Sequence, residues 1–206
     1  MTGAQFITYV EAKLNRLDSS AYQDIRPEEV LLYANDALKY LSLNFDLGTY
    51  SRSLDRGAIL NYLASLTASA KDVNLTDNAV VLPKLLKMKD LSVFVTVGEG
   101  DTQETGWVST RDLDNVKTFD RDENPFLHSY PDSPGYRLID GKITFVANGF
   151  TCSKINYDYL KFPDEITEGS NLTYVFMKEL EDHTVTLLLE TLESRRIQSQ
   201  PAVSKA

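Results

Sequence analysis

Cysteine is almost absent from this chain of 206 residues, in which Cys152 is the only one. A single thiol excludes an intrachain disulfide and any metal site built from several cysteines, and it is compatible with a reducing compartment. Nowhere does an apolar run approach the roughly 20 residues that a membrane span needs. The first residues contain neither a basic nor an apolar region of the kind that directs secretion. These absences predict a protein that is neither exported nor embedded in a membrane.

Basic residues are scarce relative to acidic ones. Lys and Arg number 21 against 30 for Asp and Glu, which gives a formal net charge of -9. Such a surface as a whole repels the phosphates of nucleic acids. The basic cluster Lys84, Lys87 and Lys89 has no aromatic residues between its lysines, and we expect it to balance local carboxylates rather than to read DNA.

The sequence lacks the familiar catalytic and metal-binding motifs. Gly-x-Ser-x-Gly, a Gly-rich phosphate loop before Lys-Ser/Thr, and His-Glu-x-x-His do not occur. Neither His128 nor His183 has a second histidine or a cysteine nearby, so both are expected to be surface or packing residues. The segment Asp120–Asn124 imitates the opening of a calcium loop, but Pro125 stands where that loop needs glycine. We therefore predict no catalytic residue, no metal site and no cofactor.

The N-terminal part is predicted to be helical. In the first helix the apolar residues recur at helical spacing, with Thr2 available as the N-cap. The second helix begins near Asp24, with Pro27 in a first turn where its missing N–H costs nothing. The third is expected around Asp55 to Ser69, where small residues allow close helix approach. The predicted buried residues of the three helices are Phe6, Val10, Leu14 and Leu17; Val30, Ala34, Ala37, Leu38 and Leu41; and Ile59, Leu60, Leu63 and Leu66, with Ala64, Ala68 and Ala70 as the small residues.

After Asn74 the pattern changes to that of β-strands. Leu91–Val97 is rich in β-branched and aromatic residues, and Ser153–Lys161 alternates apolar with polar side chains. Between them, residues 136–146 predict a hairpin, because Asp140-Gly141 supplies the positive φ angles of a two-residue turn. The polar, proline-punctuated stretch from Asp112 to Pro134 is expected to be a long exposed loop.

A last helix is predicted from about Leu172 to Gln198, with apolar residues on more than one face. Phe176, Met177, Leu180, Leu187 and Leu188 form one stripe, and Val185, Leu189 and Leu192 form a second beside it. One stripe suffices for a core, so the second is a candidate contact with another subunit. The predicted subunit or portal interface comprises Val185, Leu189, Leu192, Arg195, Arg196, Ile197, Pro201 and Val203.

These elements predict an α+β fold in a single domain spanning 1–206. Three N-terminal helices and the long C-terminal helix would form a helical bundle from residues 1–75 and 165–197. An antiparallel β lobe would be inserted at 78–163, and 198–206 would be a flexible tail.

Three segments carry a resemblance to a known family: the stretch Asp24-Ile-Arg-Pro-Glu-Glu-Val-Leu-Leu-Tyr-Ala-Asn-Asp-Ala-Leu-Lys-Tyr-Leu41, the strand Ile155–Pro163 and the closing amphipathic helix. Together they resemble the head-to-tail connector proteins, also called adaptor or tail tubular proteins, of short-tailed bacteriophages, including the crAss-like phages of gut Bacteroides. The likeness covers most of the chain in layout, but only these segments in residues.

The resemblance implies a structural protein of the virion, assembled in the host cytoplasm, and not an enzyme. Many copies, usually twelve in this family, would form a ring beneath the portal protein, extend the DNA channel and support other ring or tail proteins. DNA would pass through without sequence-specific binding, and an acidic channel wall would let it slide. The family offers no catalytic residues to transfer to this sequence.

Two other classes of function remain open from the residues alone. A small carboxylate-dependent hydrolase would need two acidic side chains in one concave pocket. A cytoplasmic scaffold or binding protein unrelated to phage would share the helices and the acidity, but it would not form a closed ring.

Overall fold

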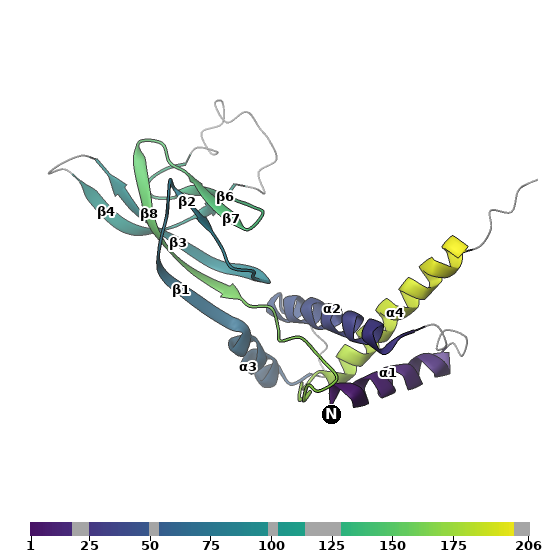
Figure 1. Cartoon of the computed structure of the whole chain (residues 1–206). Coiled ribbons are helices and arrows are strands. Elements are labelled where there is room, and N and C mark those ends of the chain that lie inside the picture. The colour runs from purple at the N-terminus through teal and green to yellow at the C-terminus, as the bar shows by residue number, and fades with distance from the viewer. Residues whose placement is uncertain (18–24, 50–53, 99–102, 114–128, 200–206) are drawn as a thin grey trace, which may run out of the picture. The chain divides into compact units, whose positions relative to one another are not determined.

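The computed structural model (Figure 1) describes residues 1–17, 25–49, 54–98, 103–113 and 129–199. In these residues the chain forms four helices and two four-stranded sheets, which confirms the predicted mixed α+β class. It divides into two compact units: Met1–Ala64 with Pro163–Ala206, here called the helical unit, and Ser65–Phe162, here called the β unit. The predicted single domain is therefore built as two units.

The first two helices follow the predicted pattern. Helix α1 is Gly3–Leu17 and α2 is Pro27–Asp46. Thr2 caps α1 as predicted, because its hydroxyl accepts a hydrogen bond from the Gln5 N–H at 3.2 Å while the Gln5 side chain accepts one from the Thr2 N–H at 2.9 Å. Leu17 is an exception: it is the last residue of α1 and is 64% exposed. The buried positions that confirm the pattern are Phe6, Val10, Leu14, Val30, Ala34, Ala37 and Leu38.

Helix α3 is shorter than predicted. It spans Arg56–Leu66 and gives way at once to strand β1, Thr67–Asn74, where the sequence pattern had predicted helix as far as Ser69. Pairing with a distant strand explains the difference, because residues 67–70 lie opposite residues 157–160 in an antiparallel ladder. The small residues of this stretch satisfy their backbone groups in the sheet instead of in another helical turn. Leu60, predicted to be buried, is 54% exposed.

Helix α4 is Met177–Ser199, and it begins later than predicted. The residues before it pair with the start of the chain: Asn171 forms a β-bridge with Thr2, and the Leu172 N–H donates to the Met1 carbonyl at 2.7 Å. That pairing holds the segment extended. At its other end α4 reaches Ser199, so residues 198–199 of the predicted tail are helical, and 200–206 lie outside the described residues.

An aromatic cluster lies at the centre of the helical unit. Phe176 is fully buried, and its ring centroid lies 4.8 Å from that of Phe45, 4.9 Å from Tyr62 and 5.1 Å from Tyr174. The Tyr62 hydroxyl shares a hydrogen bond of 2.8 Å with Ser42 on α2. Residues from α2, α3 and the segment before α4 therefore meet in one core.

The side chain of Asn35 ties α2 to the chain that returns from the β unit. Its amide nitrogen donates to the carbonyls of Leu31 at 2.9 Å and Ile166 at 3.1 Å, and its amide oxygen accepts from the Ile166 N–H at 2.7 Å. The backbone at Gly3 also lies against this returning segment, so close to it that a Cβ at Gly3 would overlap the Thr167 carbonyl oxygen.

The β unit consists of two sheets with a shared core. One sheet has the order β1-β8-β3-β4 and the other β2-β7-β6-β5. The inner faces of both sheets contribute to a single buried cluster, as in a β-sandwich. The pair β5-β6 is parallel, which corrects the prediction of a wholly antiparallel lobe. The remaining strands are β2 (Ala79–Val81), β3 (Lys87–Val97), β4 (Glu104–Ser109), β5 (Arg111–Asp112), β6 (Gly135–Ile139), β7 (Lys142–Val146) and β8 (Phe150–Leu160).

The predicted hairpin is confirmed. Strands β6 and β7 pair antiparallel, and the turn between them has positive φ at both Asp140 (51°) and Gly141 (74°). The strand predicted at 91–97 is confirmed within the longer β3, and the one predicted at 153–161 is confirmed as part of β8, which ends one residue earlier, at Leu160. Cys152 is buried in the core of the β unit, and burial raises the pKa of its thiol to about 11.

Candidate functional site

The predicted interface stripe on α4 is largely occupied by the chain's own packing. Val185 and Leu192 are 5% and 6% exposed, and Val185 belongs to the core of the helical unit. Leu189 is half-buried and packs against the same core. Of these three, only Leu189 keeps surface to offer a neighbour. The side chains of Arg195, Arg196 and Ile197, and residues Pro201 and Val203, lie outside the described part of the chain.

The exposed side of α4 is acidic instead. Asp182, Glu190 and Glu193, here called the acidic stripe, are exposed and recur at spacings that place them on one side of the helix. Within the described residues, Glu190 and Glu193 form no ion pair. Asp182 does: its Oδ1 lies 2.6 Å from Nζ of Lys13 on α1.

Lys13 balances the negative charge of two carboxylates in the N-terminal part of α4, Glu181 and Asp182. Partial burial by itself lowers the pKa of Lys13, but the hydrogen bond with Asp182 and the charges of Asp182 and Glu181 outweigh it, so the pKa is raised overall. The pairing of Lys13 with Glu181 is longer, at 3.5 Å. Among the described side chains, the exposed carboxylates of α4 without an ion pair therefore lie further along, at Glu190 and Glu193, ahead of Arg195 and Arg196 in the sequence.

A different surface occupies the outer face of the sheet formed by β2, β7 and β6. Lys142 lies opposite Val81 on one side and Ile139 on the other, so the three side chains form one row across the sheet. Thr144 stands in the next row, with Arg137 opposite it. Val81 is 73% exposed and Ile139 58%. We call Val81, Arg137, Ile139 and Lys142 the basic-apolar face.

The alternation of the strands explains why these side chains face outward. Their neighbours Ile143 and Phe145 are buried at 0% and 4% exposure, so the other face of the sheet is committed to the core. Successive residues of a strand point to opposite faces. The outward positions are therefore fixed by the burial of the inward ones.

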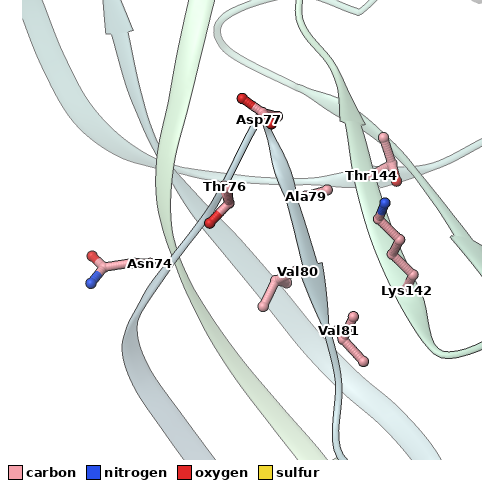
Figure 2. A pocket seen from close by; sticks show the side chains of 8 residues that line it. All are labelled: Asn74, Thr76, Asp77, Ala79, Val80, Val81, Lys142 and Thr144. Atoms are coloured by element: carbon pink, nitrogen blue, oxygen red, sulfur yellow. The ribbon is translucent and has the colours of Figure 1, made fainter.

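A groove borders the basic-apolar face. It has a volume of about 430 Å³, and Figure 2 shows Val81 of β2 close to Lys142 of β7 along its wall. Asp77 and Thr76, from the turn before β2, lie at another part of the rim. That turn is tight, with φ of 52° at Asp77 and 58° at Asn78.

Two further grooves lie in the β unit and take in the predicted basic cluster. The larger, about 690 Å³, has a mainly apolar lining that includes Leu85 and Phe162, with Lys84 and Lys87 among its lining residues. The smaller, about 230 Å³, contains Lys89 together with the carboxylates of Asp90 and Asp112. Lys89 therefore shares a groove with two carboxylates.

The remaining polar positions considered in the sequence are two histidines and an acidic segment. His183 is a packing residue, as expected, and stacks on Tyr40 with ring centroids 4.4 Å apart. His128 and the acidic segment Asp120–Asn124 lie outside the described residues. In the part of the chain that is described, no three potential metal-ligating side chains gather at one point. The described helices are also too short or too polar to cross a membrane.

No protein-family model matches the chain, and no curated protein matches it. The function must therefore be argued from the fold and its surfaces.

The basic-apolar face was not predicted from the sequence, although a signal for it was present. Once Asp140-Gly141 is taken as a two-residue turn, the strand period places Arg137, Ile139 and Lys142 on the same face. An aliphatic residue beside two cations, in a chain rich in acid, is the pattern that could have identified it. Val81 could not be added, because its pairing with Lys142 joins distant parts of the sequence.

Proposed function

We propose that this protein is a structural subunit of a phage virion that assembles into a closed ring, with twelve copies expected, beneath the portal protein. The ring would extend the DNA channel and provide the platform for further ring or tail proteins. In this proposal the helical unit is the bundle of a connector protein, and the β unit is its inserted lobe.

The observation that carries the proposal is that the β unit is inserted in the helical unit and that the two units bear surfaces of opposite charge. The two ends of the chain form a helical unit, and the stretch between them forms a separate β-sandwich. The helical unit bears the acidic stripe, and the β unit bears the basic-apolar face. A ring needs such a pair, because each copy must offer its neighbours two different, complementary patches.

The segments that carry the family resemblance fall on defined elements. The stretch 24–41 corresponds mainly to α2, the segment Ile155–Pro163 is the end of β8 with the chain that leaves it, and the closing helix is α4. The resemblance therefore draws on both units.

The charge of the chain bears on its expected relation to DNA. With a net charge of -9, the subunit would repel phosphates over much of its surface. DNA passing through a ring of such subunits would slide without sequence-specific contacts. The acidic wall is contradicted if basic residues are found to line the bore and acidic ones the outer rim.

Quantitative mass spectrometry of purified phage particles from the protein's source tests the proposal. A copy number near that of the portal protein is the expected result. Clear absence of the polypeptide from particles would rule out the ring subunit and return attention to the other two classes.

One observation favours a particular alternative among those classes. Asp90 and Asp112 line the same small groove, which is where a carboxylate-dependent hydrolase would be sought. One oxygen of Asp90 already accepts a hydrogen bond from the Leu91 N–H at 2.9 Å. If the protein is absent from particles, hydrolase assays that compare the wild type with Asp90→Asn and Asp112→Asn would decide that alternative.

A further inference from the structure

We infer that the basic-apolar face of one copy binds the acidic stripe of α4 on a second copy of this chain. The inference rests on the proposed function, and it adds which surfaces form the contact between neighbouring subunits.

The basic-apolar face has the chemistry of a contact surface. Val81 and Ile139 flank Lys142 and expose most of their aliphatic surface, which favours burial by a partner. Arg137 adds a second exposed cation in the next row, and neither row contains a carboxylate. The face therefore presents two aliphatic side chains on either side of a lysine, with a second cation in the next row, so the complementary partner is acidic with some apolar surface.

Helix α4 offers that complement. Glu190 and Glu193 are exposed and form no ion pair within the described residues, whereas Asp182 is already held by Lys13. Leu189 lies one helical turn before Glu193, on the same side of the helix, and is only half-buried, so it can supply apolar contact. The half-buried Leu189 also belongs to the interface predicted from the sequence.

The spacing of the charges is compatible on the two surfaces. Residues three apart on a helix, such as Glu190 and Glu193, have Cβ atoms about 5–6 Å apart. Diagonal neighbours on a sheet, such as Lys142 and Arg137, lie about 7–8 Å apart. The long, flexible side chains of lysine and arginine span the difference, so each cation can reach one carboxylate.

Isotope-coded cross-linking of the full-length protein tests the contact. Equal amounts of ¹⁴N- and ¹⁵N-labelled protein are mixed and treated with a carbodiimide, which joins a lysine amine to a carboxylate without a spacer. The expected product is a mixed-isotope peptide pair linking Lys142 to Glu190 or Glu193. Mixed-isotope products of Lys142 that lead only to other carboxylates would overturn the inference.

Lys154 is the matched control. Its side chain is 47% exposed on the other sheet of the β unit, and its Nζ lies 3.9 Å from Asp72 Oδ1 in the same chain. It should couple to Asp72 within one copy and give only same-isotope products. A mixed-isotope yield from Lys154 equal to that from Lys142 would show random collision and would also overturn the inference.

The same reaction on purified phage particles separates this inference from the proposed function. If the protein is present near the portal's copy number but the Lys142 product is missing, the contact is wrong and the ring proposal stands. If the protein is absent from particles while the mixed-isotope product forms in solution, the contact stands and the ring proposal fails. A product linking Lys142 to an acidic peptide of a different virion protein would assign the face to that protein and overturn the contact between copies.

A charge reversal at Arg137 tests the contact further, because it leaves Lys142 available for cross-linking. Arg137→Glu should lower the yield of the Lys142 product about tenfold, since losing one close ion pair and gaining a like-charge contact is worth on the order of 1.4 kcal/mol. Lys154→Glu should leave the yield unchanged. Equal yields from Arg137→Glu and the wild type would exclude Arg137 from the contact.

Discussion

The helical unit and the β unit are closed in different ways. The helical unit joins segments from opposite ends of the sequence, through contacts such as Met1 with Leu172 and Asn35 with Ile166. The β unit is one continuous stretch, Ser65–Phe162, with its own buried cluster. An insertion of this kind can complete its core from local sequence, whereas the helical unit depends on the chain coming back after the insertion.

The two units also differ in what they leave exposed. Helix α4 of the helical unit turns carboxylates outward, while the outer sheet face of the β unit presents aliphatic side chains and cations. The core-facing sides of α4 and of this sheet both carry buried apolar side chains. The difference between the units therefore lies on their surfaces, which is where partners are chosen.

The largest expected effect comes from breaking one core and leaving the other intact. Phe176→Ala removes the centre of the aromatic cluster in the helical unit and should cost about 3–5 kcal/mol, whereas Ile155→Ala in the β unit should cost about 2–5 kcal/mol. Trp107, the only tryptophan, lies in β4 and reports on the β unit, while helical circular dichroism reports on the other.

Because the buried clusters are separate, Phe176→Ala should lower the midpoint of the dichroism transition and leave the Trp107 fluorescence transition in place. Ile155→Ala should do the opposite. If each variant shifts both transitions together, the two units unfold as one, and the distinction between them fails at the level of stability.

The next effect concerns the hydrogen bonds by which the Asn35 side chain joins α2 to Ile166, in the later segment of the helical unit. Asn35→Ala removes three hydrogen bonds and leaves the backbone groups of the buried Ile166 without these partners, which should cost about 1–3 kcal/mol. Urea unfolding followed by circular dichroism measures it. The exposed Asn148→Ala in the β unit is the control and should change little. Equal stability of both variants would show that Asn35 does not hold the ends together.

A similar cost is expected where α1 approaches the chain before α4. Gly3→Ala places a methyl group against the Thr167 carbonyl, so the backbone must move, at about 1–3 kcal/mol. A Cβ at Gly169 meets nothing within 4 Å, so Gly169→Ala should be nearly neutral. Thermal unfolding of the pair compares the two sites. A neutral Gly3→Ala would argue against the close approach.

The smallest effect is a dependence on alkaline pH. Burial raises the pKa of Tyr62 from 10.0 to about 12, although its hydrogen bond with Ser42 acts in the opposite direction. The folded state therefore holds the proton more tightly than the unfolded state. The contribution of Tyr62 to the free energy of unfolding is complete below the pKa of the unfolded state and is lost as the pH rises through about 12.

Tyr62→Phe should cost about 1 kcal/mol near neutral pH, through the lost hydrogen bond, and should lose less stability than the wild type on going to alkaline pH. Urea unfolding at about pH 8 and about pH 11 measures both. Tyr9→Phe, at a position that is 59% exposed, is the control and should keep the wild-type pH dependence. If Tyr62→Phe and the wild type lose the same free energy of unfolding between the two pH values, groups other than Tyr62 cause the loss of stability at alkaline pH.

Prediction from sequence succeeded where the signal was local. The Thr2 cap, the Pro27 start of α2 and the Asp140-Gly141 turn each depend on a few neighbouring residues, and each is present as expected. It failed where a distant segment changed the outcome: β1 replaces the end of a predicted helix because of β8, and α4 starts late because Asn171 and Leu172 pair with the N-terminus.

The candidate surfaces divide in the same way. The sequence by itself determined the mixed α+β class, the acidic balance and the placement of Arg137, Ile139 and Lys142 on one face of their hairpin, because strand period and turn chemistry are local properties. Only the tertiary structure decided that Val185 and Leu192 are buried, that Leu189 keeps surface, and that Val81 stands beside Lys142. Those facts depend on contacts between residues far apart in the chain, and no local pattern encodes which of several apolar stripes the rest of the fold will cover.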